Sequence, residues 1–102
     1  MDKTLIHSIF EIHSILEAVC KQFNVSLKQL RSTSHRFDLV LARACYAKIA
    51  TSVGFTLGFV GKFIGKSKAM VAIYLKRHKS YLSVAEYRLN YNCLQHYGET
   101  KF

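Results

Sequence analysis

The side chains with the clearest chemical capacity are the cations in the middle of the chain. Between Asp38 and Glu86 the sequence holds no acidic residue. The same interval holds eight basic residues: Arg43, Lys48, Lys62, Lys66, Lys68, Lys76, Arg77 and Lys79. Because a surface of one sign repels itself unless a polyanion lies against it, this pattern favours binding to nucleic acid. A basic face that meets only solvent, or an anionic membrane surface, is the alternative.

Within this interval, two short helical patterns flank a turn at residues 64–66. Gly65 can take a positive φ there without steric cost, and the hydroxyls of Thr56 and Ser67 are suited to cap the two helices. Two helices joined by about three residues with a glycine describe a helix-turn-helix. The start of its second helix is the part that meets base edges in duplex DNA. The residues at that start are Lys68, Ala69 and Met70.

No catalytic or metal-binding motif accompanies these cations. Residues 61–67 superficially resemble a phosphate-binding P-loop, but Gly61 and Gly65 enclose three residues instead of four and follow no strand pattern. The cysteines lack the short spacing of zinc ligands and are expected to be reduced and buried: Cys20, Cys45 and Cys93. We therefore predict no enzymatic activity, no metal, no cofactor and no small-molecule substrate.

The elements that must position the cations are all expected to be helices, because the chain contains no proline. Apolar spacings of three and four predict helices over residues 9–23 and 38–53, with a short helix capped by Ser26 between them. A last helix is expected to begin at Ser80 or Ser83, with Ser83 to Glu86 as a capping box, and to end near Gly98. We predict one domain over residues 1–102, a compact bundle of about six helices with a lead-in at 1–9 and a tail at 98–102.

In the long helix over residues 38–53, the spacing predicts a single buried stripe, with Arg43 and Lys48 off it. The stripe comprises Leu39, Ala42, Tyr46, Ile49, Ala50 and Val53. No apolar run reaches the roughly 18–20 residues of a membrane span, and the N-terminus lacks the features of a signal peptide. We expect a cytoplasmic protein without a membrane partner.

Three stretches carry a likeness to a known family: residues 19–32, residues 39–47 with the Ala42-Arg43 pair, and residues 60–63 followed by Gly65. They resemble the first two helices, the long helix and the helix-turn-helix of the C-terminal DNA-binding domain of the bacterial replication initiator DnaA. That domain has an all-α, Trp-repressor-like fold. The likeness extends over residues 12–77. At residues 66–71, only the basic first residue and the last valine of the family's base-reading segment are kept.

The resemblance implies a double-stranded DNA-binding module that acts in replication initiation or its regulation, for instance in a mobile element. The loop at residues 32–36 is then expected in the minor groove, through Ser34, His35 and above all Arg36. Arg43 is expected to hold a phosphate. The segment expected in the major groove comprises Lys66, Ser67, Lys68, Ala69 and Met70.

An interaction module that kept the fold without binding specific DNA is the rival interpretation. The last helix is rich in tyrosine: Tyr81, Tyr87, Tyr91 and Tyr97. An exposed patch of such aromatic residues is typical of protein interfaces, which leaves a homodimer open.

Overall fold

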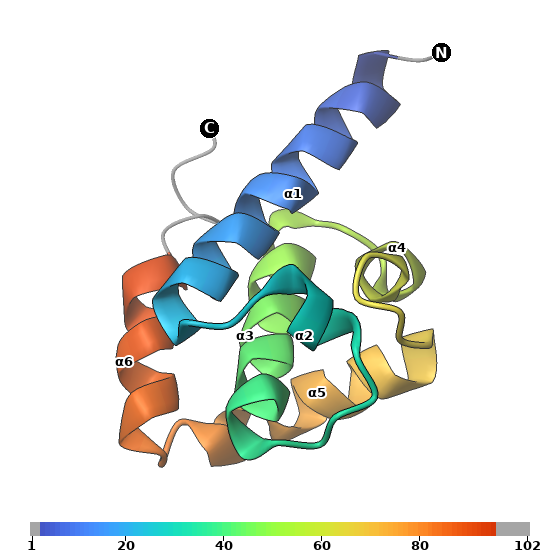
Figure 1. Ribbon diagram of the computed structural model, residues 1–102. Helices are drawn as coiled ribbons and strands as arrows, with labels where there is room; N and C mark the ends of the chain where they lie inside the picture. The colour runs from blue at the N-terminus through green and yellow to red at the C-terminus, as the bar shows by residue number, and fades with distance from the viewer. Residues whose placement is uncertain (1–2, 96–102) are drawn as a thin grey trace.

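The computed structural model describes residues 3–95, with side chains from residue 5 onward (Figure 1). Its six helices are α1 (Lys3–Phe23), α2 (Leu27–Arg31), α3 (Phe37–Val53), α4 (Leu57–Lys62), α5 (Lys68–Tyr81) and α6 (Ala85–Leu94). No strand occurs in this part of the chain. The fold is therefore the predicted all-α bundle. The predicted helix end near Gly98 and the tail lie outside the described residues.

Helix α3 lies at the centre and contacts each of the other five helices (Figure 1). The predicted stripe is buried apart from Val53, which is half-buried. Burial also extends to the opposite side, where Arg43, Ala44 and Ala47 are inaccessible. Neighbouring helices cover most of α3 and leave only Phe37 and Ser52 exposed, so the single-stripe prediction for α3 was too narrow.

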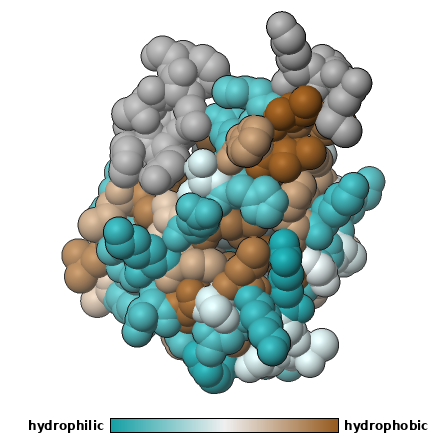
Figure 2. Space-filling model, turned by 45° about the horizontal axis from the view of Figure 1, so that its top comes forward, coloured by the Kyte–Doolittle hydropathy of each residue, from teal (hydrophilic) through white to brown (hydrophobic). Residues whose placement is uncertain are grey.

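Helix α1 begins at Lys3 and continues without a break through the predicted lead-in. Its later turns bury Ile12, Leu16 and Val19 in the core. Its first turns extend beyond the other helices (Figure 1) and expose Leu5, Ile6 and Phe10. Hydrophobic surface accordingly lies at this end of the helix in Figure 2, among mostly hydrophilic side chains elsewhere on that face.

The local signals for three helix starts are confirmed. Ser26 forms a full capping box with Gln29, while Thr56 accepts from the amide of Phe59 and Ser67 from that of Met70. Each hydroxyl satisfies a backbone N–H that has no partner within its helix. These caps fix where α2, α4 and α5 begin.

The connection between α4 and α5 is a close-packed turn over residues 63–67, longer than predicted. Gly65 has a φ of 64°, the predicted left-handed conformation. The amides of Ile64 and Lys66 both donate to the carbonyl of Gly61, at 3.1 and 3.0 Å. A Cβ atom at Gly61 would lie 2.4 Å from the Lys66 carbonyl oxygen, so only glycine permits this approach. The absence of a side chain at Gly61 thus allows the turn before α5 to pack closely against α4.

The predicted start of the last helix was wrong in detail. Val84 is the N-cap residue of α6 and makes no side-chain capping bond. The Ser83 hydroxyl instead donates to the carbonyl of Ser80 at 2.8 Å, so it is directed back toward α5 and cannot cap α6. None of the helices in the described residues has the length and apolar content needed to span a membrane.

Candidate nucleic-acid interface

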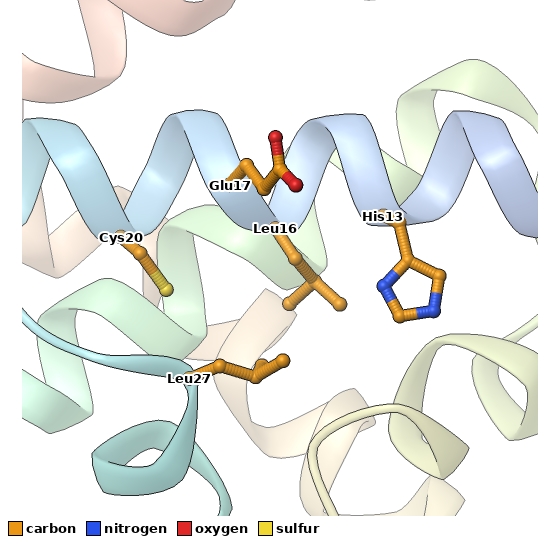
Figure 3. Close-up of a pocket in the computed structure, with 5 residues that line it drawn as sticks. All are labelled: His13, Leu16, Glu17, Cys20 and Leu27. Atoms are coloured by element: carbon orange, nitrogen blue, oxygen red, sulfur yellow. The ribbon is translucent and has the colours of Figure 1, made fainter.

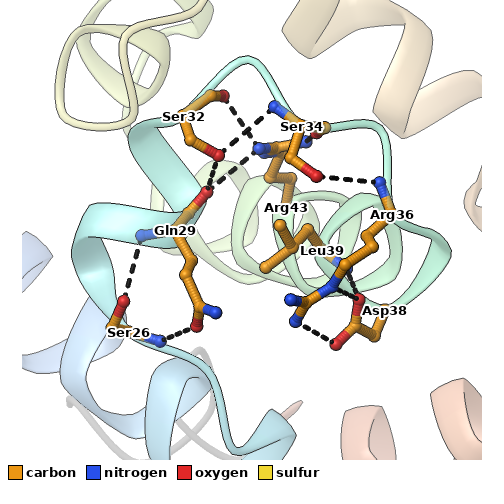
Figure 4. Close-up of polar contacts among 8 residues, drawn as sticks. All are labelled: Ser26, Gln29, Ser32, Ser34, Arg36, Asp38, Leu39 and Arg43. Atoms are coloured by element: carbon orange, nitrogen blue, oxygen red, sulfur yellow. Dashed lines mark hydrogen bonds and ion pairs between the residues drawn. The ribbon is translucent and has the colours of Figure 1, made fainter.

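Arg43 is buried, with 1% of its surface exposed. Its Nε donates to the carbonyl of Leu30 at 2.9 Å and its Nη1 to that of Ser34 at 2.8 Å. Its Nη2 donates to the carbonyls of Gln29 and Ser32, at 3.1 and 2.9 Å (Figure 4). The expectation that Arg43 holds a phosphate was therefore wrong, because every guanidinium nitrogen is already bonded and shielded from solvent.

The position of Arg43 follows from the end of α2. The carbonyls of Gln29 and Leu30 belong to the last turn of a short helix, where the Gln29 carbonyl also accepts from the C-cap residue Ser32. A guanidinium with five donors in one plane satisfies them together with two carbonyls of the following loop. Arg43 thus holds the loop at residues 32–36 on the body of the protein.

The loop residues predicted for the minor groove differ in their availability. His35 is exposed, whereas Ser34 is half-buried and accepts from the backbone amide of Arg36 at 3.2 Å. Arg36 is exposed, but it forms a two-bond ion pair with Asp38, at 3.0 and 2.8 Å (Figure 4). The pairing raises the pKa of Arg36 and lowers that of Asp38. The ion pair occupies the Nε and Nη2 of Arg36 and offsets its charge locally, which weakens the attraction of Arg36 for a further anion.

Two side-chain hydrogen bonds join α2 and this loop to the turn between α4 and α5. The Nε of Arg31 donates to the carbonyl of Phe63 at 2.9 Å, and the Nζ of Lys66 to that of Ser32 at 3.0 Å. Burial, and to a lesser extent the positive charge of Arg43, lowers the pKa of Lys66. Lys66 therefore braces the loop against the start of α5, and its ammonium group is already engaged.

The predicted residues at the start of α5 divide between surface and core. Ser67, Lys68 and Ala69 are exposed. Met70 is half-buried and packs against the core beside buried Val71. Of the expected base-reading residues, Lys68 and Ala69 are accessible, and Met70 serves mainly in packing.

The accessible surface of α5 continues well beyond this start. We call its exposed side the cationic face; it comprises Lys68, Ala69, Ala72, Ile73, Lys76, Arg77, Lys79 and Ser80. On this helix the predicted site ended at Met70 and left out the later residues. Helical spacing from Lys68 was the available signal, since Ala72 and Lys76 follow it by four and eight positions.

Electrostatics favour an anion over this face. Neither α4 nor α5 contains an acidic residue. Between the two helices, an open groove is lined by Thr56, Leu57, Gly58, Lys68, Ala69 and Ala72. The groove and the cationic face are continuous through Lys68, Ala69 and Ala72.

A second concavity, between α1 and α2, has a different chemistry. Leu16 and Leu27 lie at its centre, and His13 and Cys20 at its two ends (Figure 3). Burial, and to a lesser extent the negative charge of Glu17, raises the pKa of the Cys20 thiol, which disfavours the reactive thiolate. The described residues contain no group of three or more His, Cys, Asp or Glu side chains that could hold a metal ion.

Comparison of the chain with protein-family models, with curated proteins and with solved structures gave no match. The likeness to the DnaA C-terminal domain therefore stays a prediction from the sequence motifs.

Proposed function

We propose that this chain binds double-stranded DNA through the cationic face of α5, with the loop at residues 32–36 alongside. The observation that carries the proposal is the composition of this face. It exposes Lys68, Lys76, Arg77 and Lys79 on a helix without acidic residues. An α-helix fits the major groove of B-form DNA, and the flanking phosphates attract cations on such a helix.

The packing supports a helix-turn-helix role for α4 and α5. The turn at residues 63–67 holds the two helices in contact, and Val71 and Tyr74 anchor α5 to the core. The bond from Lys66 to the carbonyl of Ser32 keeps the loop close to the start of α5. One duplex can then meet both segments. The resemblance to DnaA further favours a role in replication initiation or its regulation.

A salt titration of DNA binding tests the proposal. In a plot of the logarithm of affinity against the logarithm of salt concentration, each neutralised phosphate contributes about −0.9 to the slope. The four exposed cations therefore predict a slope of about −3 to −4. Binding of a labelled duplex should weaken accordingly in fluorescence anisotropy. The double variant Lys76→Ala, Arg77→Ala should make the slope shallower by about two units. Lys21→Ala, which removes an exposed cation on α1, should leave the salt slope unchanged. Absence of duplex binding at low salt would overturn the proposal.

A homodimer is the second candidate, and the first turns of α1 favour it. Phe10 is 70% exposed, and Leu5 and Ile6 are 43% and 40% exposed beside it. The tyrosines that first suggested a dimer offer less support. Tyr87 is fully buried, Tyr81 and Tyr91 are half-buried against it, and Tyr97 lies outside the described residues. Sedimentation of the wild type and of Phe10→Ala tests for a dimer held through α1; a wild-type monomer at all concentrations excludes it.

A further inference from the structure

The centre of the cationic face is apolar although it is exposed. Ala69, Ala72 and Ile73 lie between Lys68 at the start of the helix and Lys76 and Arg77 two turns later. Ile73 is 37% exposed, so about a third of the surface of this large aliphatic residue is open to solvent.

Core packing does not account for this apolar surface. The buried side of α5 is formed by Val71, Tyr74 and His78, which are 0%, 4% and 9% exposed. Ile73 and Ala72 lie on the other side of the helix, because the buried residues recur at spacings of three and four. Replacing Ile73 with a smaller residue should therefore leave the core intact.

The side chains of this face limit which base edges it can read. Adenine is usually read by Asn or Gln and cytosine by Asp or Glu, and the face carries none of these. Lysine and arginine donate to guanine, and aliphatic groups contact the C5-methyl of thymine. The exposed aliphatic groups of Ala69, Ala72 and Ile73 match the thymine methyl in polarity.

We infer that α5 recognises thymine in the major groove by packing the C5-methyl group against Ala69, Ala72 and Ile73. This inference rests on the proposed DNA binding and specifies its target. Charge complementarity supports DNA as the occupant, because Lys68, Lys76 and Arg77 surround the apolar centre with positive charge. An apolar partner helix would leave these cations without anions.

Replacing thymine with deoxyuridine, which lacks only the C5-methyl, tests the inference. A duplex would first be selected for tight binding from a random pool. It would then be synthesised in two forms for each thymine position, one with thymine and one with deoxyuridine. Loss of one buried methyl should weaken binding about fourfold. The salt slope should not change, because the phosphates are the same.

The variant Ile73→Ala should reduce the preference for thymine over deoxyuridine and keep the salt slope. Leu89→Ala is the matched control, since Leu89 is 61% exposed on α6. Circular dichroism would verify that both variants are folded. Equal affinity for thymine and deoxyuridine duplexes, with a normal salt slope, would overturn this inference alone. Failure to bind any duplex would overturn the proposed function as well.

Discussion

Arg43 and Lys66 donate hydrogen bonds to the same acceptor, the carbonyl oxygen of Ser32, at 2.9 and 3.0 Å. One cation comes from the central helix and the other from the turn before α5. Their shared acceptor ties the loop, the turn and α3 into one unit. Two residues predicted to contact DNA thus serve instead to hold the surfaces that we propose contact it.

Arg43→Met should destabilise the fold by about 3 kcal/mol. The substitution removes four hydrogen bonds; the carbonyls of Leu30 and Ser34 lose their side-chain donor, whereas those of Gln29 and Ser32 keep other donors. Urea unfolding followed by circular dichroism measures the change. Arg77→Met is the matched control, because exposed Arg77 should alter stability by less than about 0.5 kcal/mol. Equal stability of the two variants would mean that the carbonyl contacts of Arg43 contribute nothing.

Asp38→Asn should strengthen DNA binding and make the salt slope steeper by about one unit. The ion pair with Asp38 occupies Arg36, and its loss frees one cation for a phosphate. Fold stability should change little, because exposed ion pairs contribute about 0–1 kcal/mol. Glu86→Gln, which removes one exposed negative charge on α6, controls for net charge. If both variants bind equally, Arg36 does not contact the duplex.

Gly61→Ala and Gly58→Ala, both in α4, should change stability in opposite directions. A Cβ at Gly61 would meet the backbone oxygen of Lys66 at 2.4 Å, whereas one at Gly58 meets nothing within 4 Å. We expect Gly61→Ala to cost about 1–3 kcal/mol. Gly58→Ala should add about 0.5–1 kcal/mol, because alanine loses less backbone entropy in a helix. Thermal unfolding of both proteins checks the two signs; equal shifts in the same direction would contradict the close approach.

His78 should make the protein less stable as the pH falls below its ordinary pKa of 6.5. Burial, followed by the charge of Lys48, lowers the pKa of His78, and its Nδ1 is hydrogen-bonded to the Tyr87 hydroxyl at 2.5 Å. Because the folded pKa lies below the unfolded one, the unfolded chain binds more protons in this window. The free energy of unfolding should therefore decrease from neutral pH toward the folded pKa.

Chemical unfolding at several pH values would measure this dependence. His78→Gln should flatten the curve below pH 6.5. A curve that stays unchanged in His78→Gln would assign the pH dependence to another group.

Signals confined to a few residues predicted the helix starts well. Ser26, Thr56 and Ser67 cap their helices because a hydroxyl and an amide three residues later need no distant partner. Gly65 is likewise explained locally, because the turn needs a residue with positive φ. Ser83 has the same local pattern, but the carbonyl of Ser80 competes for its hydroxyl.

Features that depend on packing could not be predicted in this way. Arg43 lies off the apolar stripe of its helix, which is typical of a surface residue. Its burial depends on carbonyls of α2 and of the loop, and periodicity within α3 contains no information about them. Ala72 and Ile73 were missed because the family motif ends at Val71. Spacing from Lys68 places Ala72 beside the cations, and the observed exposure adds Ile73 to the same side of α5.

The charge of Arg43 is compensated by carbonyl dipoles, and in the described part of the chain it forms no ion pair. Dipoles stabilise a cation without cancelling its monopole, and the surrounding interior screens it less than water does. An approaching polyanion would thus be attracted by a residue that it never touches.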